Sequence, residues 1–377
     1  MPQISVNTQF DAGSIVIKDL SNANNLRFEI RPDTNSQFAQ WFYFQLNGVK
    51  HQELTLHLDN LGTTAYPDGW IDYNVCASYD NTNWFRIDSS FTNNSLSWSL
   101  TPEANSIYFA YFEPYPYQRH QELIALANSA ENTHHQVIGQ TREGRNLDLV
   151  IIGDQNAKHK VWVTARQHPG ETMAEWFMEG LIHRLIDGQD SISNSLLQEY
   201  AFYLVPNMNP DGAIHGNLRT NSSGTNLNRE WLTPSIENSP EVYYVREQML
   251  ALGVDMFFDI HGDEALPYVF TSGCADNKSF SAKQEQLETK FEQLFQLLNP
   301  DYQTVHGYPK NHFSVESATV ATKWVGNQFD CLAFTLEMPF KDNANLPDLT
   351  TGWNGYRSYL LGQSLLTAIH ALVNTTS

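Results

Sequence analysis

The chain has 377 residues, of which 41% are hydrophobic and 17% charged, so it can bury a large core and does not resemble a disordered protein. Its length favours two domains over one. The formal net charge of −20, from 42 acidic and 22 basic side chains, would repel a phosphate backbone and argues against a nucleic-acid partner.

The first third of the chain predicts short strands separated by Asn, Gly, Asp and Ser turns. Its opening residues lack a basic segment followed by a long apolar stretch, so they predict neither a signal peptide nor a membrane span. Six or more strands at this spacing predict an antiparallel β-sandwich domain over residues 1–116. The clearest strands are expected at residues 15–17, 26–30, 40–46, 53–58, 75–79 and 106–112.

From residue 117 to residue 377 longer helical segments alternate with apolar strands. This alternation predicts an α/β domain with a mixed central sheet flanked by helices. Strands are expected at residues 148–152, 161–165, 201–205, 255–260 and 331–337, and helices at residues 120–129, 173–186, 240–252, 279–298 and 356–373.

The three cysteines are far apart in the sequence and odd in number. Cys76, Cys274 and Cys331 have no paired metal-ligand spacing, so a disulfide framework is not expected. Cysteines that serve only in packing suit a reducing compartment, and we therefore expect a cytoplasmic protein.

Chemically reactive side chains stand at or just past the ends of three predicted strands. His168 and Glu171, in the sequence His-Pro-Gly-Glu, follow one strand, His261 ends a second, and Glu337 ends a third. Ligands of open α/β sheets gather at the carboxyl ends of the strands, so these residues are expected to meet. A histidine and a carboxylate at positions i and i+3, with a distant histidine, are typical of an open catalytic zinc site.

Further motifs follow in a specific order between these residues. They are Asn-Pro-Asp-Gly at residues 209–212, Gly-Asn-Leu-Arg at 216–219 and Asn-Leu-Asn-Arg at 226–229. In this order the chain resembles the zinc carboxypeptidase A superfamily over residues 135–340. The preceding sandwich, the Tyr-Phe-Glu-Pro-Tyr-Pro-Tyr run at 111–117 and the His-Pro-Gly-Glu form narrow the resemblance to the cytosolic carboxypeptidase subfamily.

The resemblance implies a carboxypeptidase-like fold, a role for each motif, and removal of C-terminal residues from peptides or proteins. His168, Glu171 and His261 would bind one Zn²⁺ per chain, with a position left open for water. A further set would complete the site: Glu337 as the base that becomes the acid, Arg219 as the oxyanion-stabilising residue, and Asn228 and Arg229 as the residues that hold the terminal carboxylate.

Several neighbouring positions depart from the family pattern or admit more than one assignment. Arg166 and Asp259 are equally well read as groups that support the metal ligands or as strand-end charges. Asn226 stands where many members of the superfamily have an aspartate that orients a zinc-binding imidazole. No tyrosine precedes Glu337 at the spacing of the substrate-capping tyrosine of digestive carboxypeptidases, and Tyr308 is a weak candidate for that role.

The residue that selects the C-terminal side chain is expected near Thr322. The adjacent Lys323 could favour an acidic terminal residue, consistent with the glutamate removal typical of the subfamily, although a solvent-facing lysine is an equally good reading. Two other functions stay open: an N-acyl amino acid amidohydrolase of the desuccinylase or aspartoacylase type, and a non-catalytic peptide-binding protein on this scaffold. The oligomeric state is not predicted.

Overall fold

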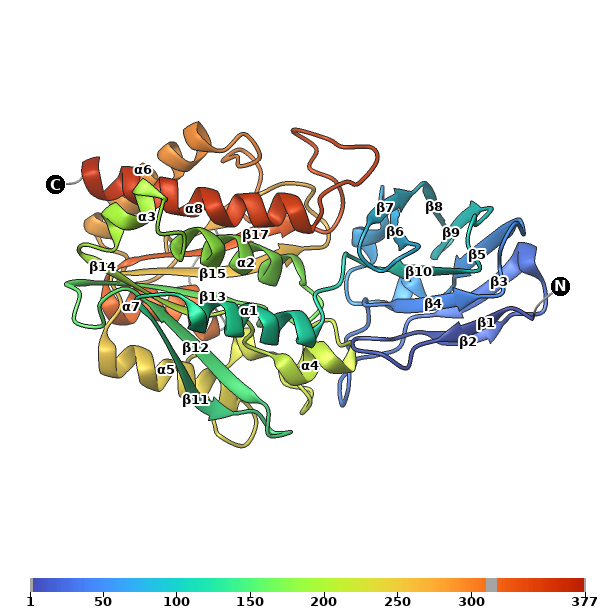
Figure 1. Cartoon of the computed structure of the whole chain (residues 1–377), viewed down its shortest axis with the longest axis horizontal. Coiled ribbons are helices and arrows are strands. Elements are labelled where there is room, and N and C mark those ends of the chain that lie inside the picture. Colours follow the sequence, from blue (N-terminus) through green and yellow to red (C-terminus); the bar gives the residue numbers. More distant parts are fainter. Residues whose placement is uncertain (1–2, 310–316, 376–377) are drawn as a thin grey trace.

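The computed structural model of the chain describes residues 3–309 and 317–375. Two five-stranded sheets make up the N-terminal part, and a seven-stranded sheet covered by helices makes up the C-terminal part (Figure 1). The predicted fold class, a mixed α/β sheet flanked by helices and preceded by a β-sandwich, is therefore confirmed.

The N-terminal strands bury alternate residues, as β5 shows with its buried Leu54, Leu56 and Leu58. All pairs are antiparallel except β3 with β5. The first sheet has the order β1 (Ser5–Asn7), β4 (Tyr43–Asn47), β10 (Ser106–Ala110), β6 (Val75–Ser78) and β7 (Trp84–Ile87). The second has the order β2 (Val16–Asp19), β3 (Leu26–Glu29), β5 (Leu54–Leu58), β9 (Ser95–Leu100) and β8 (Ser89–Thr92). Short 3-10 helices in this part are η1 (Ala23–Asn25), η2 (Leu61–Thr63) and η3 (Pro67–Trp70).

The seven-stranded sheet is parallel at its centre and antiparallel at both edges. The parallel strands β14, β13, β15 and β17 are nearly continuous apolar runs because helices cover both faces. The strand order is β11 (Thr133–Gln140), β12 (Asn146–Ile152), β14 (Tyr200–Val205), β13 (His159–Ala165), β15 (Met256–Asp263), β17 (Leu332–Pro339) and β16 (Phe270–Ser272).

Helices pack against the two faces of this sheet in separate cores. One core includes residues of α1 (Tyr117–Ser129), α2 (Met173–Leu185), α3 (Ser191–Leu196), α6 (Ala282–Leu298) and α8 (Gly355–Thr375). The other includes residues of α5 (Pro240–Leu252) and α7 (Ala321–Phe329). The short helices α4 (Pro210–His215), η4 (Leu227–Arg229) and η5 (Ser317–Thr319) lie in connecting segments. Among the described residues no helix combines the length and apolarity needed to span a bilayer.

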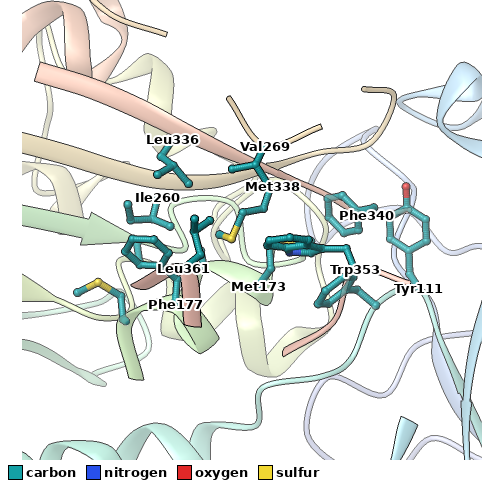
Figure 2. Close-up of a cluster of buried hydrophobic side chains, with 14 of the residues drawn as sticks. Tyr111, Met173, Phe177, Ile260, Val269, Leu336, Met338, Phe340, Trp353 and Leu361 are labelled. Atoms are coloured by element: carbon teal, nitrogen blue, oxygen red, sulfur yellow. The ribbon is translucent and has the colours of Figure 1, made fainter. Parts of the chain in front are cut away.

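The apolar core continues from the seven-stranded sheet into the β-sandwich. Tyr111, just after β10, stacks on Phe340, just after β17, with ring centroids 4.6 Å apart. Figure 2 shows this pair beside Trp353 and next to Met338 of β17 and Met173 of α2. The two parts of the molecule are therefore packed against one another through buried aromatic side chains.

The prediction from sequence omitted strands that lie mainly at sheet edges. β7, β8, β11 and β16 are edge strands, and β9 is next to an edge. β11 begins Thr-His-His-Gln and has a single buried residue, so it lacks an apolar alternation. Its hydrogen bonds to β12, which only the tertiary structure supplies, make it a strand.

Candidate active site

Three buried side chains capable of binding a metal meet at one edge of the seven-stranded sheet. His168 and Glu171 lie between β13 and α2, and His261 lies on β15. The Nδ1 atoms of His168 and His261 lie 2.7 Å from Oε1 and Oε2 of Glu171, respectively. One ligand atom from each residue lies within 4.8 Å of the others. The structure thus brings the three predicted ligands together.

The sheet topology explains why residues so far apart in sequence meet. β13, β15 and β17 are neighbouring parallel strands, so their carboxyl ends lie at one edge. His261 on β15 is the register partner of Glu337 on β17. The predicted base therefore stands beside a predicted ligand.

Arg166 supports the loop that carries His168 and Glu171. Its backbone has a φ of 57°, a left-handed conformation that is unfavourable for a residue with a Cβ atom. Its buried guanidinium donates from Nε to the carbonyl of Pro169 at 2.9 Å and from Nη1 to Glu175 at 2.5 Å. These contacts answer the question left open by the sequence, because Arg166 lies inside the protein and holds the metal-binding loop.

Each histidine is held through its second ring nitrogen. Nε2 of His261 lies 2.8 Å from Oδ2 of Asp259, and Nε2 of His168 lies 3.1 Å from Oδ1 of Asn226. These oxygens accept the Nε2–H proton and leave each Nδ1 lone pair for a metal. Asp259 also accepts a hydrogen bond from Gln167 at 2.6 Å, so this second carboxylate is itself fixed.

Electrostatics distinguish the two imidazoles. Burial, opposed by the Glu171 carboxylate, lowers the pKa of His168 to about 4, so this ring is neutral at physiological pH. Burial also acts to lower the pKa of His261, but Asp259 and Glu171 outweigh it and raise that pKa. Two imidazole nitrogens and one carboxylate are all buried, and each imidazole is held by a second polar group, so together they form a donor set that fits Zn²⁺.

Glu337 lies beside the metal-binding residues in a low-dielectric environment. Burial raises the pKa of its carboxyl group to about 8, against the opposing effect of His261. Oε1 accepts a hydrogen bond from the Tyr308 hydroxyl at 3.0 Å. Oε2 is buried and has no hydrogen-bond partner among the described residues, as suits an oxygen that receives a proton from a reactant.

A cavity of about 600 Å³ opens over this cluster. This volume suits the binding of a side chain and the adjoining peptide group. The cavity brings together the predicted ligands and nearly all of the other predicted site residues: His168, Glu171, His261, Glu337, Arg219, Asn228, Arg229 and Lys323.

Asn228 and Arg229 lie on η4 at the wall of the cavity. The Asn228 side chain is held by its Oδ1, which accepts from the backbone N–H of Ala321 at 2.9 Å. Nη1 of Arg229 donates to the carbonyl of Asn228 at 2.7 Å. This contact orients a guanidinium group at the cavity.

The two residues predicted to select the substrate side chain have different positions. Thr322 is fully buried, its hydroxyl lies 2.8 Å from that of Thr335, and it is absent from the described lining of the cavity. This position does not support a direct role for Thr322 in substrate binding. Lys323 does line the cavity, where its ammonium group donates to the Asp276 carboxylate and to the carbonyl of Gly273.

Two tyrosines at the cavity were missed or undervalued by the sequence analysis. Tyr66, between η2 and η3 in the N-terminal part, lines the cavity, and no pattern around it suggested a site residue. The Tyr308 hydroxyl oxygen lies 2.7 Å from Oδ2 of Asp263 and 3.0 Å from Oε1 of Glu337, so its single proton can be donated to either carboxyl group. Tyr308 was undervalued because it lies farther from Glu337 in the sequence than the substrate-capping tyrosine of digestive carboxypeptidases does. Its hydroxyl group was the signal that could have identified it.

Two histidines, a carboxylate able to bind the same metal and a neighbouring buried acid, at the carboxyl edge of a parallel-centred sheet, are typical of a zinc hydrolase. Comparison with known families makes this specific: residues 120–356 match the zinc carboxypeptidase family, and residues 6–112 match the cytosolic carboxypeptidase N-terminal domain. The chain belongs to the zinc carboxypeptidase family and is a metallocarboxypeptidase that acts on peptides with a catalytic zinc. The predicted resemblance is confirmed.

Relatives of known structure match almost the whole chain, and a relative found by sequence matches most of it. A metallo-carboxypeptidase of Burkholderia cenocepacia is 46% identical, with a TM-score of 0.97 over 99% of this chain and 100% of that one. A metallo-carboxypeptidase of Pseudomonas aeruginosa is 44% identical, with a TM-score of 0.96 over 98% of this chain and 99% of that one. Cytosolic carboxypeptidase 6 of Caenorhabditis elegans is 28% identical over 88% of this chain and 77% of that protein.

Proposed function

We propose that the chain removes single residues from the C-termini of peptides or proteins by means of Glu337, Arg219, Asn228 and Arg229. The observation that carries this proposal is the position of Glu337, which pairs in register with His261 and lines the same cavity as the three candidate ligands, with its Oε2 buried and unpartnered among the described residues. When bound by His168, Glu171 and His261, zinc would polarise the scissile carbonyl group and acidify a water molecule.

Glu337 would act first as a base and then as an acid. Its burial raises the pKa of the carboxyl group to about 8, close to the pH at which it must both take and return a proton. The attacking water loses a proton to Oε2, and the carboxyl group returns it to the nitrogen of the departing residue. The Tyr308 hydroxyl, bonded to Oε1, keeps the carboxylate in one orientation.

The cationic residues of the cavity would determine where the chain is cut. Arg219 would stabilise the negative charge that develops on the scissile carbonyl oxygen. Asn228 and Arg229 would hold the terminal carboxylate, because a guanidinium group matches the geometry of two carboxylate oxygens. A substrate held by its terminal carboxylate presents only the last peptide bond to Glu337, which accounts for exopeptidase action.

A preference for a terminal glutamate remains our proposal, with Lys323 as the residue that recognises it. The ammonium group of Lys323 is neutralised by Asp276, and the same cavity is lined by Glu285, Glu288 and Glu292. An acidic substrate side chain must therefore displace Asp276 or share Lys323 with it. Selectivity would depend on the strength of this one salt bridge.

Three further features of the protein are proposals. We propose that it works in the cytoplasm, as its three free and buried cysteines suggest. We propose that residues 1–116 and 117–377 fold as separate domains, joined near the aromatic run at 111–117. A peptide or protein C-terminus, without nucleic acid or membrane, would be its partner, in keeping with the net charge of −20.

The test is mass spectrometry of peptides that end in glutamate, aspartate, leucine, phenylalanine or lysine, incubated with zinc-loaded protein. We expect stepwise loss of terminal residues, fastest from the glutamate peptide. Glu337→Gln should keep its zinc and lower kcat by about 10²- to 10⁴-fold. Faster loss of lysine would refute the glutamate preference. No shortening with zinc bound, together with hydrolysis of N-acyl amino acids, would favour the amidohydrolase function.

A further inference from the structure

The backbone around Arg219 is held by a carboxylate of the N-terminal sandwich. Asp33, in the segment between β3 and β4, is buried and receives hydrogen bonds from three successive backbone N–H groups. Leu218 donates to Oδ1 at 2.6 Å, and Arg219 and Thr220 donate to Oδ2 at 2.8 and 3.0 Å. The hydroxyl of Thr220 adds a fourth bond to Oδ2 at 3.1 Å. One side chain therefore sets the conformation of residues 218–220.

Other contacts hold residues 214–217, which lead into this segment, against the sandwich. Thr34 donates from its backbone N–H to Oδ1 of Asn217 at 3.0 Å, and Ala12 donates to the carbonyl of Ile214 at 3.0 Å. Gly216 has a φ of 67°, and a Cβ atom there would lie 2.6 Å from the carbonyl oxygen of Ala12. The contact is thus close enough to require glycine.

The side chain of Arg219 is also bounded by the sandwich. Its guanidinium carbon lies 5.5 Å from the ring centroid of Phe38 and 5.6 Å from that of Tyr66. Both distances are within the range of cation–π attraction. Arg219 and Tyr66 line the cavity together.

Residue 218 also contacts the loop that carries His168 and Glu171. The N–H of Gly170, next to Glu171, donates to the carbonyl of Leu218 at 2.8 Å. A Cβ atom at position 170 would lie 3.0 Å from Cα of Leu218, so the two backbones are in close contact. Residues 218–220 thus lie between Asp33 and the ligands of the metal.

We propose that Asp33 is a positioning residue for peptide hydrolysis: it fixes the backbone of residues 218–220 so that Arg219, between Phe38 and Tyr66, points at the scissile carbonyl oxygen. The proposal rests on the role proposed for Arg219. An arginine held in place before substrate binds does not lose its rotamer freedom during the reaction. The sandwich is thereby part of the catalytic apparatus.

Asp33→Asn is the direct test, since the amide keeps the size of the side chain but turns one acceptor into a donor. We expect kcat to fall about 10- to 100-fold with KM changed less than about twofold, because the oxyanion exists only in the transition state. Zinc content should not change. Thr34→Val is the matched control at the same interface, and its kcat should stay within about twofold of the wild-type value.

A double-mutant cycle with Arg219→Met separates positioning from a general structural effect. If Asp33 acts through Arg219, Asp33→Asn should cause little further loss of kcat in the Arg219→Met background. Equal losses in both backgrounds would overturn the inference. If Arg219→Met lowers kcat but Asp33→Asn does not, only the positioning role fails. If Arg219→Met is fully active, the role of Arg219 fails and the inference fails with it.

A second variant covers the case in which Asp33→Asn does not fold. Phe38→Leu keeps an apolar contact but removes the aromatic face over the guanidinium, and should lower kcat about two- to fivefold. In the Arg219→Met background the same change should have no effect. A loss of the same size in both backgrounds would overturn the proposal that the sandwich positions Arg219.

Discussion

His120 should make the stability of this protein depend on pH. The ring is buried on α1, with Nδ1 2.7 Å from Glu175 of α2 and Nε2 3.1 Å from Asp148 of β12. Burial alone would lower the pKa of His120, but the hydrogen bonds and charges of Asp148 and Glu175 outweigh it and raise the pKa to about 9. The imidazolium therefore links two helices to the sheet.

The size of the effect follows from the difference between the folded and unfolded pKa values. His120 has an ordinary value of 6.5 and a value of about 9 in the folded chain, a difference worth about 3 kcal/mol. Because the folded value is the higher one, this stabilisation is complete below about pH 6.5. It is lost as the pH rises through about 9.

The test substitution is His120→Gln. His134→Gln, at an exposed histidine on β11, is the matched control. Free energies of unfolding would be measured by urea denaturation of the zinc-loaded proteins at pH 6 and pH 10. The difference between wild type and His120→Gln should shrink by about 3 kcal/mol between these pH values, while that of His134→Gln should stay constant. A His120→Gln difference that is constant or grows with pH would refute the reasoning.

Two further predictions concern the metal and the substrate. Asp259→Asn should weaken zinc binding by about 10- to 100-fold in a chelator competition, because His261 loses a charged acceptor. Asn226→Asp should strengthen zinc binding, because His168 gains one. Zinc affinities equal to that of the wild type would contradict these predictions. Lys323→Met should lower kcat/KM for a glutamate-ending relative to a leucine-ending peptide by about tenfold, and Asp276→Asn should raise that ratio by freeing the ammonium. An unchanged ratio in both variants would exclude Lys323 as the selecting residue.

Sequence patterns were sufficient to predict the central strands and the three side chains that the structure brings together as a candidate metal site. β13, β15 and β17 are buried on both faces, so each is a mainly apolar run. His168 follows β13, and His261 and Glu337 lie near the ends of β15 and β17. His168, His261 and Glu337 were placed together because parallel strands share a carboxyl edge. The edge strand β11 was missed because its pairing, and not its side chains, makes it a strand.

The residues around the ligands depended on contacts between distant segments. Nothing near Tyr308 in the sequence indicates that its hydroxyl meets Glu337, and nothing near Thr322 indicates that it turns away from the cavity. Asp33 and Tyr66 belong to another part of the chain altogether, and they reach Arg219 only where the sandwich packs on the loop after α4.

The chain order of the motifs was enough to establish the chemistry, because ligand type and strand-end position are local properties of the sequence. The orientation of these side chains depends instead on hydrogen bonds made in the folded chain. Which imidazole nitrogen faces the metal is decided by Asp259 and Asn226, and where Arg219 points is decided by Asp33. The Asp259–His261 bond lies within β15, and the Asn226–His168 bond joins two distant segments of the C-terminal part. The Asp33–Arg219 bond forms only when the two parts of the molecule pack together.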